Sequence, residues 1–185
     1  MISFAAAGAY GALQNLVAPI HLLLRATDTF LTPRAARAYH TQGRPALERI
    51  LRLTYIISGI PILGMLAIAM LFPVPLLRLM YGETYVSYSS AMVLMALFYA
   101  LWYVYWPLQT ALKAVRLSWP IFAANLAAIL AMCSAGIWMI SRWGIYGTIA
   151  GQALNSLIVA VILWAAWLAY RRKEERNSVF SSPAD

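Results

Sequence analysis

The chain has 185 residues, of which 63% are hydrophobic and 11% are charged, and its formal net charge is +8. Soluble domains are about half apolar and about a quarter charged, so this composition excludes an ordinary soluble protein and indicates an integral membrane protein. The single cysteine, Cys133, excludes a disulfide framework and offers no basis for a metal site, so we expect neither metal nor cofactor. The positive charge lies between apolar runs, where it determines topology, and does not indicate nucleic-acid binding.

The first apolar stretch, residues 2–31, is long enough to cross a bilayer, yet it contains several polar side chains. At about 100° per residue, Gln14, His21, Arg25 and Asp28 fall on one stripe of a helix that is otherwise mostly Leu, Val, Ala and Ile. An ionised side chain in a span costs about 2.5–3.5 kcal/mol, so we expect the stripe to face protein or a wet cavity. Either Arg25 and Asp28 form a structural ion pair, or the stripe is the wall of a polar transport path.

Proline and glycine mark the limits of the second span. After Pro33 we expect a basic loop, and the next helix is predicted to begin after Gly43 with Pro45 in its first turn. The uncharged span itself covers residues 53–72. A short exposed turn around Gly82 is predicted to follow it.

The third span, residues 86–112, is uncharged and has an aromatic middle. Tyr99, Trp102, Tyr103 and Trp106 are predicted to share one helical face. Tyr99 is too central for a belt at the membrane interface, where aromatic residues of a span usually lie. The face therefore has two interpretations: packing inside the bundle, or stacking on sugar rings.

The last two spans are predicted at residues 117–140 and 145–170, with a short turn between them at Arg142 and Gly144. Near the start of the fifth span, Gly147 and Gly151 form a small-xxx-small face suited to close helix contact.

For the polar residues of the fifth span, a structural role is favoured over contact with a substrate. Gln152 and Asn155 are expected to hydrogen-bond across helices rather than to contact a substrate. The stretch 171–185 is polar and is predicted to be a disordered cytoplasmic tail, which leaves residues 1–170 as the transmembrane domain.

Five spans place the termini on opposite sides of the membrane, and the basic residues then segregate strongly. One side holds only Arg78 and Arg142. By the positive-inside rule the other side is cytoplasmic, so the N-terminus is predicted outside and the C-terminus inside a cell (inner or plasma) membrane. The basic residues of that other side are Arg34, Arg37, Arg44, Arg49, Arg52, Lys113, Arg116, Arg171, Arg172, Lys173 and Arg176.

Three segments carry a resemblance to a known family: PRAARAY after the first span, LMYGETY after the second, and RWGIYGTIAGQALNSLI leading into the fifth. In their order and spacing the chain resembles the C-terminal half of polysaccharide flippases of the multidrug/oligosaccharidyl-lipid/polysaccharide exporter superfamily. The similarity covers nearly the whole chain apart from the tail. It implies an all-α integral membrane bundle of about five transmembrane helices, the last part of a two-lobe fold around a central cavity.

The resemblance also implies a function and partners. Such proteins move lipid-linked oligosaccharide to the outer leaflet by alternating access, so the expected partners are that lipid, the bilayer, and a missing N-terminal lobe or partner chain. On this interpretation Arg25, with His21 if protonated, meets the pyrophosphate, Asp28 restrains Arg25, and the aromatic face meets the glycan. Because the first lobe and one helix of the second are absent, we expect the chain to be a fragment or to need a partner.

Two other functions remain open. A cation-coupled drug antiporter needs an unpaired acidic group in the membrane, and only Asp28 is available for it. A non-transporting subunit, scaffold or remnant is the alternative suggested by the absent lobe. An enzyme is not expected, because outside the tail the carboxylates are Asp28, Glu48 and Glu83, and none forms an evident acid–base pair with either histidine.

Overall fold

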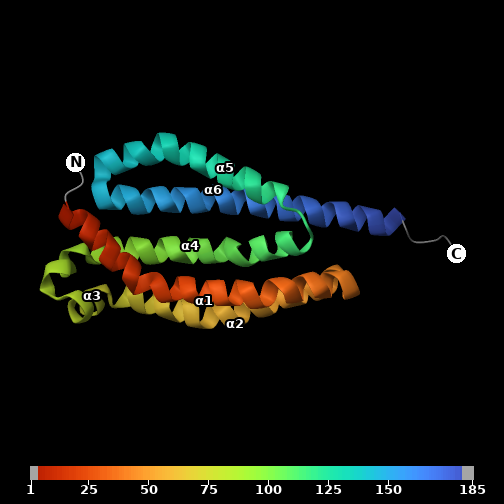
Figure 1. The fold of residues 1–185 in the computed structure, drawn as a ribbon, viewed down its shortest axis with the longest axis horizontal. Helices are drawn as coiled ribbons and strands as arrows, with labels where there is room; N and C mark the ends of the chain where they lie inside the picture. The colour runs from red at the N-terminus through yellow and green to blue at the C-terminus, as the bar shows by residue number, and fades with distance from the viewer. Residues whose placement is uncertain (1–3, 181–185) are drawn as a thin grey trace.

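A computed structural model describes residues 4–180, and within them the chain forms helices joined by short connections, with no strand (Figure 1). The all-α class predicted from the sequence is confirmed. The helices are α1 (Phe4–Gln42), α2 (Arg44–Leu71), α3 (Pro73–Tyr81), the 3₁₀ helix η1 (Glu83–Tyr88), α4 (Ser89–Ala114), α5 (Trp119–Ala131), the π-helical segment η2 (Met132–Gly136) and α6 (Ile137–Phe180).

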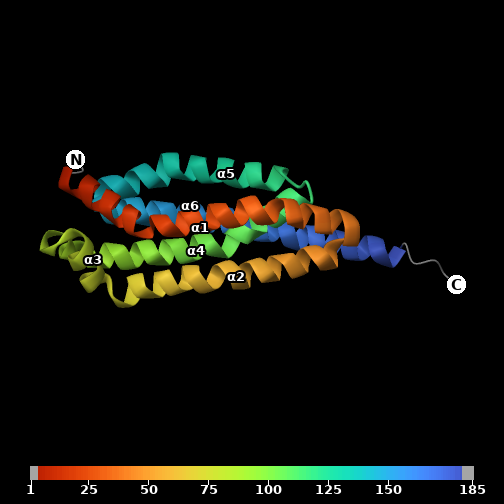
Figure 2. The same ribbon diagram turned by 60° about the horizontal axis from the view of Figure 1, so that its bottom comes forward.

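The long helices lie roughly along one common direction (Figure 1, Figure 2). Helix α4 is central, because α1 and α2 pack against it on one side and α6 packs on the other. Helix α5 lies on the far side of α6 from α4 in Figure 1 and continues through η2 into the first residues of α6. The arrangement is a bundle with α4 as its axis.

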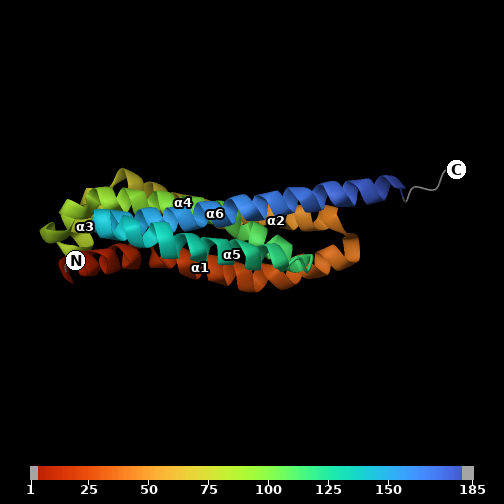
Figure 3. The same ribbon diagram turned by 90° about the horizontal axis from the view of Figure 1, so that it is seen from above.

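The predicted turn at Arg142 and Gly144 is present as a sharp reversal inside α6. Gly144 has φ 55° and ψ −122°, a left-handed conformation that a residue with a Cβ rarely adopts. The two limbs on either side of it lie side by side in Figure 1 and Figure 3. Residues 119–143 and 145–170 therefore form a helical hairpin, as the sequence predicted.

Three helical stretches among the described residues are long and apolar enough to span a bilayer: Arg44–Leu71, Glu83–Ala114 and Trp119–Lys173. The third contains the reversal at Gly144. Large apolar side chains also cover the outside of the bundle, with Leu79 82% and Ile60 72% exposed. Because lipid is itself apolar, such a surface suits a membrane and not water, so the chain is an all-α membrane bundle.

Two apolar cores hold the bundle together. The first joins α1, α2 and α4 and includes the fully buried Leu13, Leu24, Ile62 and Met95. The second joins the C-terminal part of α1 to α4, α5 and α6. Between them the two cores fix α1 against α4 along much of its length.

The expected basic loop after Pro33 is wrong, because α1 continues through this proline to Gln42. Ala35 is completely buried in the second core and Tyr39 packs against the same core, so tertiary contacts offset the backbone hydrogen bond that proline removes. The helix breaks at Gly43, and Pro45 lies in the first turn of α2, as predicted. The second helix thus begins nine residues before its predicted apolar span.

The expected exposed turn around Gly82 is also wrong in part. It contains the helix α3, which begins at Pro73 because a proline is compatible with the first position of a helix. Leu77 anchors α3 by being fully buried in the first core. The break at Gly82 itself is present.

The tail does not become irregular at residue 171. Helix α6 continues to Phe180, and the described part of the tail contains no glycine or proline that would end a helix (Figure 2). The predicted disorder is therefore wrong for residues 171–180. Residues 1–3 and 181–185, which include the ends of the predicted first span and tail, lie outside the described residues.

The fold gathers the cationic side chains at one end of the bundle, here termed the basic end. Helices α1, α4 and α6 finish there, and α2 and α5 begin there (Figure 1). Arg78 in α3 and Arg142 at the hairpin turn lie at the opposite end. The charge asymmetry read from the sequence thus exists in space, and the orientation of the basic end towards the cytoplasm remains a prediction.

Candidate functional site

Polar side chains of α1 make a row of contacts where this helix meets α4 and α6. We term this row the α1 seam. Its contacts centre on Tyr10, His21 and Asp28, and at 1.5 Å per residue it extends for about 27 Å along the helix. That length is close to the roughly 30 Å thickness of the hydrocarbon region, although α1 itself is not among the three stretches that are apolar enough to span a bilayer.

The first contact of the seam is a glutamine–tyrosine cluster. The side-chain amide of Gln14 donates to the Tyr10 hydroxyl over 2.8 Å, and the amide of Gln152 in α6 donates to the same hydroxyl. Gln152 therefore hydrogen-bonds across helices, in agreement with its predicted structural role. Gln14 is exposed, so one edge of this cluster is open.

The second contact joins His21 to the aromatic residues of α4. The His21 Nε2 atom and the Tyr99 hydroxyl are 2.6 Å apart, and the imidazole centroid lies 4.7 Å from the Trp102 ring. Trp102 in turn contacts Trp106, with ring centroids 4.8 Å apart. His21, Tyr99, Trp102 and Trp106 thus form a continuous series of rings, here termed the aromatic ladder.

The indole nitrogen of Trp106 sets the last ring of the ladder apart. Its N–H is buried and has no hydrogen-bond partner in the described part of the chain. An unsatisfied buried donor is unfavourable by about 1–3 kcal/mol and is uncommon in native structures. The ladder therefore ends on a polar group that the bundle encloses but does not satisfy with the described residues.

Tyr103 contacts α2 and not His21. Its hydroxyl donates to the backbone oxygen of Tyr55 in α2 over 2.7 Å, and it lies against Gly59 of the same helix. Adjacent helical positions differ by about 100°, which directs Tyr103 towards α2 while Trp102 faces His21. Tyr103 therefore belongs to the packing of α2 on α4, and the aromatic ladder contains only the other three aromatic residues and His21.

The third contact fixes Asp28 to the basic end of α4. The carboxylate accepts hydrogen bonds from Thr32 over 2.9 Å and from Thr110 over 2.7 Å, and the Lys113 ammonium is 3.4 Å away. The expected pair between Arg25 and Asp28 is absent from the described residues. Two hydroxyls and the ammonium already surround the carboxylate, so Asp28 neither restrains Arg25 nor neutralises it.

Arg25 lies at the exposed edge of the seam, one helical turn from His21. No carboxylate of the described residues forms a salt bridge with it. A guanidinium in this position is an uncompensated positive charge beside the aromatic ladder. It is the strongest candidate in the seam for binding an anion.

Sequence reasoning identified the α1 side of the seam, the aromatic residues of α4 and Gln152 of α6, but it missed Thr110 and Lys113 as the partners of Asp28. Lys113 was expected only as a basic residue between two spans. Within the described residues, no group of three His, Cys, Asp or Glu side chains gathers as a metal site does.

Comparisons of the chain with protein-family models, with curated proteins and with solved structures find no match.

Proposed function

We propose that the chain is the C-terminal part of a membrane flippase that translocates lipid-linked oligosaccharide or polysaccharide precursors by alternating access. The observation that carries this proposal is Arg25, which has no salt bridge with the described residues and lies beside the aromatic ladder on a helix of a membrane bundle. The resemblance of three sequence segments to polysaccharide flippases supports the same function.

The chemistry of such a cargo matches the two parts of the seam. A pyrophosphate is a dense anion, and an arginine binds it through charge-assisted, bidentate hydrogen bonds. The rings of Trp102 and Trp106 are half-buried and offer apolar faces on which a sugar can stack. A second lobe, in the same or a partner chain, would close the cavity over this face.

A second candidate is a membrane subunit that does not transport. The observation in its favour is that Tyr10, His21 and Asp28 are all hydrogen-bonded within the bundle, as structural contacts between membrane helices are. The cation-coupled antiporter is less well supported, because its only acidic candidate, Asp28, already holds Lys113.

Transport by proteoliposomes tests the proposal. The full chain is reconstituted in vesicles with a fluorescent polyprenyl-diphosphate oligosaccharide, and flipping is followed by access of a membrane-impermeant quencher. Loss of a charge-assisted hydrogen bond predicts that Arg25→Gln slows flipping about tenfold, whereas Arg142→Gln, the matched control at the opposite end, leaves the rate unchanged.

Two outcomes contradict the proposal. Equal rates for the wild type and Arg25→Gln would remove the cargo role of this arginine. Wild-type vesicles that flip no faster than protein-free vesicles would favour the non-transporting subunit for this chain.

A further inference from the structure

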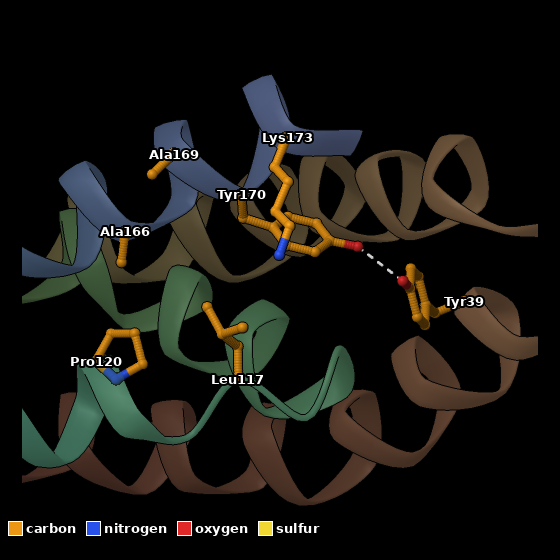
Figure 4. Close-up of a pocket in the computed structure, with 7 residues that line it drawn as sticks. All are labelled: Tyr39, Leu117, Pro120, Ala166, Ala169, Tyr170 and Lys173. Carbon is orange, nitrogen blue, oxygen red and sulfur yellow. Dashed lines mark hydrogen bonds between the residues drawn. The ribbon is translucent and has the colours of Figure 1, made fainter. Parts of the chain in front are cut away.

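A pocket opens at the basic end of the bundle, outside the α1 seam. Its volume is about 570 Å³, within the usual range of about 300–1,000 Å³ for sites that bind small molecules. It lies between the C-terminal part of α1, the start of α5 and the C-terminal part of α6 (Figure 4). Its lining residues are Tyr39, Leu117, Pro120, Ala166, Ala169, Tyr170 and Lys173.

The pocket has one apolar wall and one polar rim. Leu117, Pro120, Ala166 and Ala169 form the wall. At the rim, the hydroxyls of Tyr39 and Tyr170 are 2.7 Å apart, and the Lys173 side chain reaches from α6 past the Tyr170 ring, as Figure 4 shows. The pocket therefore suits a molecule with an apolar body and a polar head.

The charges at the rim select an anionic head. Lys173 is exposed, and none of the seven lining residues given above carries a negative charge. Arg176 lies three residues beyond Lys173, which places it on the same side of α6, and Arg116 immediately precedes Leu117. A hydrogen bond between two neutral hydroxyls is also about half as strong as one to a phosphate oxygen, so an incoming phosphate can displace it.

The depth of the pocket matches the headgroup region of a bilayer. Trp119, 73% exposed, precedes Pro120 of the pocket wall, and Trp143 is exposed at the other end of the hairpin limb. Exposed tryptophans mark the two membrane interfaces, and these two are separated by about 36 Å at 1.5 Å per helical residue. The pocket thus lies beside one interface, with its polar rim continuing along α6 away from the hairpin turn.

We propose that this pocket binds an anionic phospholipid, with the phosphate at Lys173 and the Tyr39–Tyr170 hydroxyls and the acyl chains along the apolar wall. Basic pockets between membrane helices are known to hold such headgroups. The site lies apart from the aromatic ladder and does not depend on the cargo proposed for the α1 seam.

Native mass spectrometry of the purified full chain tests this site without any transport measurement. The probes are dioleoylphosphatidylglycerol and dioleoylphosphatidylcholine, which have the same acyl chains. We expect tighter binding of the anionic lipid, and a loss of about fivefold in its affinity for Lys173→Gln, as for removal of one lysine near a membrane surface. Arg172→Gln, an exposed neighbour that does not line the pocket, is the matched control and should change the affinity by less than the Lys173 variant.

A second pair of variants tests the apolar wall. Ala169→Trp should fill the pocket and abolish selective binding of the anionic lipid, whereas Ala165→Trp should not, because Ala165 is exposed on the same helix outside the pocket. Both positions are exposed, so neither ring has to enter a core.

Three results would overturn the site. The first is equal affinity of wild type and Lys173→Gln for the anionic lipid. The second is competition by glycerol phosphate as effective as that by the intact lipid, which would assign the pocket to a soluble phosphate. The third is a lipid-free dimer that Ala169→Trp dissociates, which would assign it to a second copy of the chain.

Discussion

The two limbs of the α5–α6 hairpin contact each other through small residues, whereas α1 meets α4 through hydroxyls, a histidine and an ion pair. In the hairpin, a side chain at Gly147 would collide with the backbone of Met139, and Gly151 lies close to Gly136 and Met132. In the α1 seam, the joining groups are Tyr99, His21 and the Asp28–Lys113 pair.

The difference shows which contact is free to serve a function. Because lipid is as apolar as leucine, membrane helices associate by close packing or by hydrogen bonds and not by the hydrophobic effect. Two helix backbones in close contact leave no polar side chain between them that is free to bind a ligand. A hydrogen-bonded seam with an exposed edge retains such side chains, for example Arg25. We therefore expect the hairpin to determine stability and the exposed edge of the seam to determine function.

The largest loss of stability is expected for Gly147→Ala. Its new methyl group would meet backbone atoms of Met139 and Ile140, which cannot move aside without opening the hairpin, and the predicted loss is about 3 kcal/mol in the free energy of unfolding. Unfolding by SDS in mixed micelles measures it. Gly64→Ala is the matched control, because a Cβ there meets no atom within 4 Å. An equal loss of unfolding free energy in the two variants would contradict this prediction.

Asp28→Asn should have the next largest effect. It removes the ion pair with Lys113 and weakens the bonds from Thr32 and Thr110, but the ion pair is partly exposed, so the expected loss is about 1 kcal/mol. A double-mutant cycle with Lys113→Gln isolates the pair. A coupling energy of zero would show that Lys113 does not hold Asp28.

Tyr99→Phe should have a smaller effect, about 0.6 kcal/mol, which is typical for one hydrogen bond between membrane helices. The substitution keeps the ring in the ladder and removes only the hydroxyl that contacts His21. His21→Phe and the double variant, measured in the same unfolding assay, complete the cycle. If the loss of stability in the double variant equals the sum of the two single losses, the 2.6 Å contact contributes no coupling energy.

Arg25→Gln should change stability least, within about 0.5 kcal/mol, because the side chain is exposed and has no salt bridge with the described residues. Its unfolding transition in SDS should overlay that of the wild type. A large loss of stability would place Arg25 in the structural part of the seam and remove the reason for assigning it to cargo.

The sequence was informative where local conformation decides the structure. The hairpin turn at Gly144 and the start of α2 after Gly43 follow from residues that permit a positive φ. The sequence was misleading where contacts between helices determine the structure. Burial of Ala35 carries α1 through Pro33, and burial of Leu77 orders α3, and neither effect is visible in a local pattern.

The seam was predictable on one helix and not across helices. Helical periodicity put His21, Arg25 and Asp28 on one stripe, but it could not choose between Arg25 and Lys113 as the partner of Asp28. That choice depends on α1 and α4 lying side by side, with Asp28 and Lys113 both near the basic end of the bundle. Likewise, periodicity grouped Tyr103 with Trp102 because it does not say where α2 packs.

The central claim, that the exposed edge of the α1 seam lines a water-accessible path, is tested most directly by thiol labelling in proteoliposomes. In a Cys133→Ser background, Arg25→Cys is compared with Leu23→Cys, which is exposed on the same helix about 160° around the axis from position 25. Thiols react as thiolates, which need water, so a membrane-impermeant methanethiosulfonate should label position 25 rapidly and position 23 hardly at all. Equally slow labelling at both positions would show that Arg25 faces lipid or protein and would contradict the account.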